Sequence, residues 1–299
     1  MKDLYQDVKR NKYGYYELSG IIGEDKLSEF YTNSYYQSDR AVYQHEYTDK
    51  DLKEKYNRLE EKKYVIENYL STINREKKFL DIGCGEGFAL EYFLRYGYEV
   101  TGIDFSTEGC KYHNPEVLEK IVVGDALYVL DKLYQDKYLG TVLLDHVLEH
   151  VVKPEKLIQK ITMISRPGTC LIISVPNDFS ETQIKLWEEG YIDTPFWVTT
   201  SYPPEHLSYF RKESLEKLLA ENGWKMEFIM NSFPIDFNLF NENTNYVRNK
   251  EVGKSCYRAS IEIEELMYKM VGVHGLVDIY RKLGEYGIGR DITAFFIRQ

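Results

Sequence analysis

The chain has 299 residues, 43% of them hydrophobic, and a net charge of −10. This length and hydrophobic content are enough for one large domain or for a core domain with added segments. Proteins contact nucleic-acid phosphates mainly through Lys and Arg side chains, so the negative net charge of this chain disfavours a nucleic-acid partner. None of the four cysteines forms a CxxC pair, and we expect neither a bound metal nor a disulfide framework. No apolar signal core and no run of roughly 20 apolar residues is present, which favours a cytoplasmic protein without a membrane partner.

Residues 1–75 are expected to form an N-terminal helical and lid segment. Within it, residues 49–71 carry apolar side chains at helical spacing. The charged faces of this helix are predicted to be solvated, and they carry no sign of a binding surface.

From Lys78 onward, short apolar strands alternate with helices. The predicted strands are residues 79–82, 99–104, 120–123, 141–144, 169–175, 225–230 and 292–297. This alternation predicts an α/β doubly wound fold with a mostly parallel, seven-stranded sheet and helices on both faces. Right-handed crossovers place the carboxyl ends of the parallel strands along one edge, where ligands bind.

Two segments interrupt the predicted core of residues 76–231 and 291–299. Residues 178–207 are aromatic, contain proline and follow the fifth strand, which predicts a lid loop over the strand ends. Its rings could stack on a substrate or form a small core of the lid itself; they include Trp187, Phe196 and Trp197. Residues 232–290 are predicted to be a helical cap inserted before the last strand.

A glycine-rich turn carries the strongest chemical signal. Asp81-Ile-Gly83-Cys84-Gly85-Glu86-Gly87 directly follows a predicted strand and precedes a helix. Its glycines permit positive φ and a close approach of the backbone to a ligand, and the helix N-terminus presents free N–H groups. Asp104 ends the next strand, where a carboxylate can accept both hydroxyls of an adenosine ribose.

A dinucleotide is the main rival ligand for this turn. Binding one would require a small residue at position 88, and the bulky Phe88 obstructs the close approach of a pyrophosphate. Asp81 instead suits the amino-acid part or the sulfonium of S-adenosylmethionine (SAM). Together with Asp104 and Gly124-Asp125-Ala126, the turn predicts a SAM site.

Residues 79–177 resemble class I SAM-dependent methyltransferases, which have a Rossmann-like fold. The sequence is most similar to the group that contains ubiquinone-pathway O-methyltransferases and sugar methyltransferases of bacterial polysaccharide clusters. The resemblance is carried by Phe79-Leu-Asp-Ile-Gly-Cys-Gly-Glu-Gly87, Gly102-Ile-Asp-Phe105, Asp145-His-Val-Leu-Glu-His-Val151, Arg166-Pro-Gly168 and Val175-Pro-Asn177.

The resemblance implies how SAM, and its product S-adenosyl-L-homocysteine (SAH), would be held. The residues expected at or near the methionine end are Asp81, Gly83, Gly85, Asp145 and His146, with Cys84 as a small packing residue in the same loop. Those expected at the ribose and adenine are Asp104, Phe105, Asp125 and Ala126. Tyr36, or its neighbour Tyr35, is expected to close over the cofactor.

Two histidines are candidate general bases. His150 could accept a proton, since histidine side chains in general titrate near neutral pH, or it could be a structural residue that anchors its loop. His206 in the lid could deprotonate a hydroxyl, or it could fix the lid through a hydrogen bond. Methyl transfer needs mainly the alignment of donor and acceptor, so activity does not require a base.

The leading hypothesis is O-methylation of a small polar acceptor, such as a sugar or sugar nucleotide of a surface polysaccharide pathway. N- or C-methylation, a phenolic or quinone acceptor, and a SAM-binding protein without turnover stay open as alternatives. The sequence also leaves open whether the protein forms a homo-oligomer.

Overall fold

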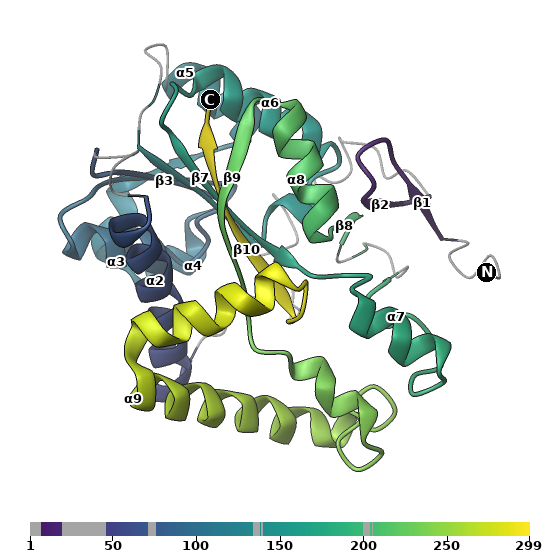
Figure 1. The fold of residues 1–299 in the computed structure, drawn as a ribbon. Helices are drawn as coiled ribbons and strands as arrows, with labels where there is room; N and C mark the ends of the chain where they lie inside the picture. The colour runs from purple at the N-terminus through teal and green to yellow at the C-terminus, as the bar shows by residue number, and fades with distance from the viewer. Residues whose placement is uncertain are drawn as a thin grey trace.

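The computed structural model is centred on a seven-stranded sheet (Figure 1). The residues it describes are 7–19, 46–70, 76–133, 138, 140–199, 204 and 206–299. In sheet order the strands are β5 (Ile121–Val123), β4 (Glu99–Asp104), β3 (Lys78–Ile82), β6 (Thr141–Asp145), β7 (Cys170–Pro176), β10 (Asp291–Arg298) and β9 (Trp224–Asn231). The first five strands are parallel, and β10 runs antiparallel to both of its neighbours. The predicted Rossmann-like class I methyltransferase fold is thereby confirmed.

Helices cover both faces of the sheet. One face carries α5 (Ala126–Leu133), α6 (Pro154–Ile164) and α8 (Lys212–Glu221), and the other carries α2 (Asp49–Asn68), α3 (Phe88–Arg95) and α9 (Gly253–Glu285). Each face has its own apolar core. Every residue of β7 is buried, as expected for a strand covered on both sides.

Helix α9 is folded back on itself (Figure 1). Its backbone leaves the helical conformation at Gly272, where φ is 67°, a value that favours glycine. The second arm packs on the sheet through Leu276, Val277 and Tyr280, in the same core as the buried residues of α2. The two helices therefore lie together over one face of the sheet, near its β9 edge.

A second, three-stranded antiparallel sheet lies beside the main one. It consists of β1 (Val8–Arg10), β2 (Tyr16–Leu18) and β8 (Ser208–Tyr209). These strands, α7 (Glu181–Glu188) and the 3₁₀ helix η4 (Ile235–Phe240) surround a small core that contains Trp197. The predicted helical N-terminal segment thus includes two short strands. The other elements are α4 (Glu108–His113), η2 (Pro115–Lys120), η3 (Leu148–His150) and η5 (Lys250–Val252).

The lid aromatics pack among themselves in the described part of residues 178–207. Trp197 is buried in the small core, and Trp187 and Phe196 pack against it. Of the two interpretations of these rings, the structure favours a core of the lid itself. The division of the chain into N-terminal segment, core and cap stays a prediction.

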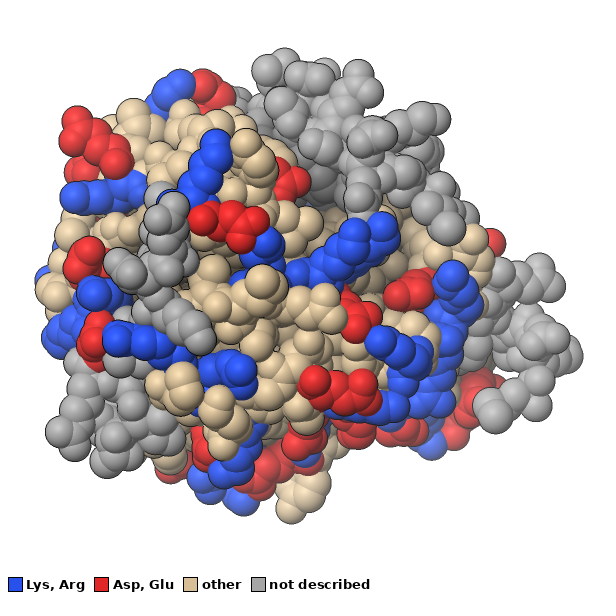
Figure 2. Space-filling view, turned by 90° about the horizontal axis from the view of Figure 1, so that it is seen from above, with Lys and Arg blue, Asp and Glu red and all other residues tan. Residues whose placement is uncertain are grey.

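The surface mixes charges of both signs. On the face shown in Figure 2, Asp and Glu are interspersed with Lys and Arg, whereas nucleic-acid surfaces gather basic residues into a patch or stripe. Within the described residues, no helix combines the length and apolarity that crossing a bilayer requires.

Candidate functional site

A cavity of about 830 Å³ opens at the carboxyl ends of the parallel strands. Its volume lies within the range of small-molecule sites, roughly 300–1,000 Å³. The structure brings together every predicted cofactor residue that it describes. These lining residues are Asp81, Gly83, Cys84, Gly85, Asp104, Phe105, Asp125, Ala126, Asp145 and His146. Tyr36 lies outside the described residues.

The glycine turn between β3 and α3 forms one wall of the cavity. Gly83 has φ of 77°, and a Cβ there would lie 2.5 Å from Cγ2 of Val147, so both its conformation and its packing require glycine. Its N–H donates to the carbonyl of Ile103 at 2.7 Å, which ties the turn to β4. Gly85 also has positive φ, and nothing lies within 4 Å of a Cβ built on it. The backbone at Gly85 is therefore open to a ligand.

Three carboxyl groups converge beside this turn. Asp104 accepts the N–H of Gly85 at 2.8 Å and that of Ser106 at 3.0 Å, which fixes its carboxylate. Asp81 is 3% exposed, and burial together with the charges of Asp145 and Asp104 raises its pKa well above the usual range. A cation placed between these groups would relieve their mutual repulsion.

Lys62 of α2 gives this side of the cavity its one buried ammonium among the described residues. Its Nζ lies 3.4 Å from Oδ2 of Asp145. Against the effect of burial, Lys62 and His146 lower the pKa of Asp145 to about 2. An amino-acid zwitterion carries an ammonium group, which the carboxylates can bind, and a carboxylate, which the ammonium of Lys62 can bind. The donor set therefore fits the methionine end of SAM.

His146 follows β6 in an unusual conformation. Its φ is 54°, which is uncommon outside glycine, and its N–H donates to the carbonyl of Ser174 at 2.9 Å. Nδ1 lies 3.3 Å from Oε1 of Glu149. The side chain of His146 is 44% exposed at the open cavity. Partial desolvation opposes protonation, but the bond to Glu149 and the charges of Asp291 and Asp145 raise the pKa of His146 to about 9, which favours a cationic ring and disfavours a role as a base.

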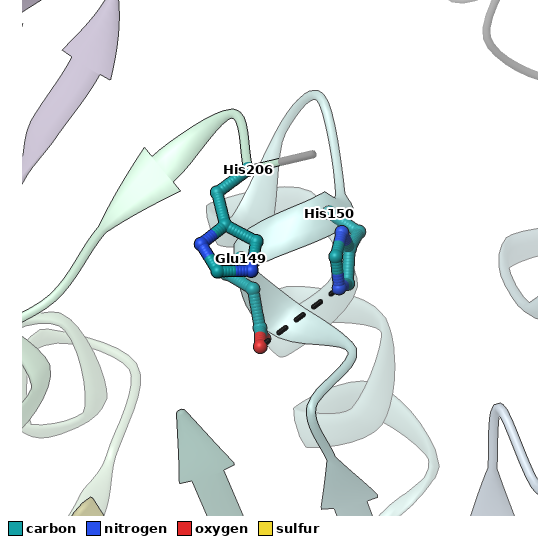
Figure 3. A group of neighbouring side chains, drawn as sticks. All are labelled: Glu149, His150 and His206. Atoms are coloured by element: carbon teal, nitrogen blue, oxygen red, sulfur yellow. Dashed lines mark ion pairs between the residues drawn. The ribbon is translucent and has the colours of Figure 1, made fainter. Parts of the chain in front are cut away.

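The two candidate bases lie beside each other (Figure 3). Their ring centroids are 5.0 Å apart, but of the two only His150 lines the cavity. Nδ1 of His206 lies 3.7 Å from Oδ2 of Asp178. Glu149 is 1% exposed, and its Oε1 lies 3.9 Å from Nε2 of His150, the contact marked by the dashed line in Figure 3. Position therefore favours His150 as the proton acceptor.

Glu149, His150 and His206 could also hold a metal ion. Each offers one ligand atom, and these atoms lie within 4.8 Å of one another. Tetrahedral ligands of Zn²⁺ lie roughly 3.3 Å apart, so the group would have to contract around an ion. The expectation that the protein binds no metal stays a prediction.

The cavity continues past the cofactor residues, into a region that the sequence analysis did not identify. This second half lies between α2, α9 and the ends of β9 and β10. Its lining residues are Glu54, Arg58, Glu61, Asn231, Ser232, Tyr257, Glu264, Tyr280 and Asp291. The prediction that the charged faces of α2 are solvated is therefore wrong, because one of these faces lines the cavity and Glu61 and Lys62 are buried there. The spacing of Glu54, Arg58 and Glu61 on one helical face was the available signal.

Ionic and hydroxyl contacts organise this half. Nη2 of Arg58 lies 2.7 Å from Oε1 of Glu54, and the other carboxylate oxygen of Glu54, Oε2, accepts the hydroxyl of Tyr257 at 2.7 Å. The hydroxyl of Tyr280 donates to Glu264. Burial, reinforced by the charge of Glu264, raises the pKa of Glu61 to about 7. We call these polar walls the acceptor half, and the part around Asp81 and Asp104 the cofactor half.

Comparison with known proteins agrees with the fold. A family model described as a methyltransferase domain matches residues 43–227, more than half of the chain. The chain therefore belongs to this methyltransferase family. The predicted membership of the SAM-dependent methyltransferases is confirmed as a family assignment.

Individual relatives are more distant. The chain is 32% identical over 104 residues to a ubiquinone biosynthesis O-methyltransferase of Pectobacterium atrosepticum, covering 34% of this chain and 43% of that protein. It is 24% identical over 227 residues to the human mitochondrial protein of the same name, covering 68% of this chain and 57% of that one. A SAM-dependent methyltransferase structure from Archaeoglobus fulgidus aligns with a TM-score of 0.46 at 21% identity, covering 81% and 94% of the two chains. The chain thus spans less than half of the bacterial relative.

Proposed function

We propose that the protein is a SAM-dependent O-methyltransferase that acts on a small polar acceptor such as a sugar or sugar nucleotide. The observation that carries the proposal is the polarity of the acceptor half. Carboxylate, amide, guanidinium and hydroxyl groups line it, and such groups pair well with the many hydroxyls of a sugar. Sugar hydroxyls would satisfy these groups, whereas an apolar acceptor would leave them unpaired in a buried site.

The chain's own residues would bind and align the reactants. Asp81, Asp145 and Lys62 would hold the methionine end of SAM, and Asp104 would hold the ribose. SAM supplies a methyl group on its sulfonium when it is bound. His150 would accept the proton of the acceptor hydroxyl. Positioning and the exclusion of water would provide most of the acceleration.

A phenolic or quinone acceptor is the second candidate. The names of the curated relatives favour it, since they are ubiquinone biosynthesis O-methyltransferases. The charged acceptor half argues against an acceptor that carries a long apolar tail.

Labelled methyl transfer tests the proposal. The protein is incubated with methyl-labelled SAM and two acceptor panels, one of sugars and sugar nucleotides and one of catechols and hydroxyquinones. We expect label on a hydroxyl oxygen of a member of the first panel. Label confined to the second panel would assign the alternative. SAM binding by calorimetry without transfer to any acceptor, including those in a cell extract, would indicate a binding protein without turnover.

A further inference from the structure

Four carboxyl groups surround one guanidinium in the acceptor half. Arg58 interacts electrostatically with Glu54, Asp291, Glu264 and Glu61. It is 2.7 Å from Glu54 and 3.9 Å from Asp291, so these two take its closest contacts. Among the described residues, Glu61 and Glu264 are left without a cation in contact with them.

Asp291, unlike these two carboxyl groups, has groups nearby that stabilise its negative charge. It accepts the hydroxyl of Ser232 at 2.9 Å, and the charges of His146, Arg290 and Arg58 lower its pKa against the effect of burial. The excess negative charge of the acceptor half is therefore concentrated at Glu61 and Glu264.

Glu61 is the more exceptional of these two groups. It is 7% exposed, and it makes no hydrogen bond, and no ion pair within 4 Å, with the described part of the chain. Glu264 has the hydroxyl of Tyr280 as its partner and no ion pair in the same region. Both side chains line the cavity. Burying a carboxylate without a counter-charge in direct contact is unfavourable, so a cation between them would stabilise both.

Asn231 provides an independent indication of a ligand. It ends β9, lines the cavity and is 1% exposed, yet within the described residues neither its Nδ2 nor its Oδ1 has a hydrogen-bond partner. Buried amides are almost always paired in folded proteins. An amide can donate and accept at once, which suits the neighbouring hydroxyls of a polyol.

We propose that Glu61, Glu264 and Asn231 form a subsite for an acceptor that carries both hydroxyl groups and a protonated amine, such as an amino sugar or an aminocyclitol. The two carboxylates take the ammonium group, and Asn231 pairs with a hydroxyl. This inference rests on the proposed function and narrows its acceptor class. It also disfavours a sugar nucleotide, because the carboxylates would repel a diphosphate placed in the same half.

Matched amine and N-acetyl pairs test this subsite directly, because acetylation removes the charge and keeps the ring. SAH-saturated protein is titrated in a calorimeter at pH 7.5 with glucosamine, galactosamine and mannosamine, each beside its N-acetyl form, and with 2-deoxystreptamine. We expect at least one free amine to bind roughly tenfold more tightly than its N-acetyl form, the discrimination of a desolvated charge contact.

Variants then test which residues cause the preference for the free amine over its N-acetyl form. Glu61→Gln should reduce the preference to about twofold or less, and Glu264→Gln should weaken it, because each removes a charge facing the ammonium. Glu60→Gln is the matched control: Glu60 is the neighbouring carboxylate, bonds the hydroxyl of Tyr268 and does not line the cavity. It should retain the full preference.

Two results would overturn the subsite. One is the absence of any amine preference across the panel; the other is a preference that Glu61→Gln leaves intact. SAH affinity, measured for every variant, reports on folding and on the cofactor half. If the unaltered protein did not bind SAH, this result would contradict the proposed function itself. SAH binding and methylation of neutral sugars without an amine preference would contradict the subsite alone.

Discussion

The two halves of the cavity are built in opposite ways. The cofactor half is formed largely by a continuous stretch of chain around the glycine turn, and backbone groups satisfy its key carboxylate: Asp104 accepts two N–H groups. The acceptor half is assembled from side chains of α2, α9, β9 and β10, and two of them, Glu61 and Asn231, have no hydrogen-bond partner within the described part of the chain. The cofactor half is preorganised by backbone, while the acceptor half holds unpaired polar groups that a ligand would have to satisfy.

The largest effect should arise where the halves meet, at His150. Replacing it with Gln should lower kcat on the order of 100-fold or more, the usual contribution of a general base, and leave SAH affinity nearly unchanged. His206→Gln is the matched variant, since His206 does not line the cavity, and it should lower kcat by less than about tenfold. Steady-state kinetics with the acceptor found by labelling measures both. A larger loss of kcat in His206→Gln would exchange the two roles.

The next effect isolates the cofactor half. Asp104→Asn removes a charged acceptor of ribose hydroxyls and should weaken SAH binding on the order of 10- to 100-fold. Asp131→Asn is a suitable control, because Asp131 is exposed and pairs with Lys160 at 2.6 Å. Calorimetry with SAH compares the two variants. Equal affinities would mean that Asp104 does not contact the cofactor.

Stability as a function of pH isolates the acceptor half. The pKa of Glu61 is about 7 in the folded protein against a usual 4.5, so the folded state binds this proton more tightly than the unfolded state. The free energy of unfolding should therefore fall as pH rises from about 4.5 to about 7, by roughly 3 kcal/mol from this group, and level off above that pH. Arg58, Glu264, Lys62 and Glu60 are the charged groups that act on it.

Glu61→Gln should remove this pH-dependent destabilisation. Urea unfolding of the ligand-free protein should show the variant gaining stability relative to the unaltered protein between pH 5 and pH 8. Glu60→Gln should show a much smaller trend, because Glu60 has the smallest effect of the charges that act on Glu61. A stability difference that is the same at both pH values would mean that Glu61 is ionised throughout.

The contrast between the halves also explains what the sequence could predict. The strands from β3 to β7, and β9 and β10, are short apolar runs, so local pattern was enough to find them. Residues 81–86 and Asp104 lie in a recognisable local order, and they do meet in one cavity. By contrast, Glu61 and Glu264 come together only because α9 folds back at Gly272 and packs with α2 over the sheet. No local pattern specifies that packing.

Short elements escaped prediction for a related reason. β1, β2 and β8 have two or three residues each, too few to show a period, and pairing across the chain defines them. The aromatic residues of the lid were consistent with either a binding loop or a core. Their burial together around Phe179 and Trp197 depends on η4 and β8, which lie outside the lid.

The smallest expected effect tests how far the organisation of the acceptor half depends on hydroxyl groups. Tyr257 donates its hydroxyl to Glu54, which in turn holds Arg58. Tyr257→Phe removes one hydrogen bond to a charged group, so acceptor affinity should fall by roughly three- to tenfold while SAH affinity is unchanged. Tyr286→Phe, an exposed tyrosine outside the cavity, serves as the control. If Tyr257→Phe changed SAH affinity as well, the two halves would be coupled through α2, which supplies both Arg58 and Lys62.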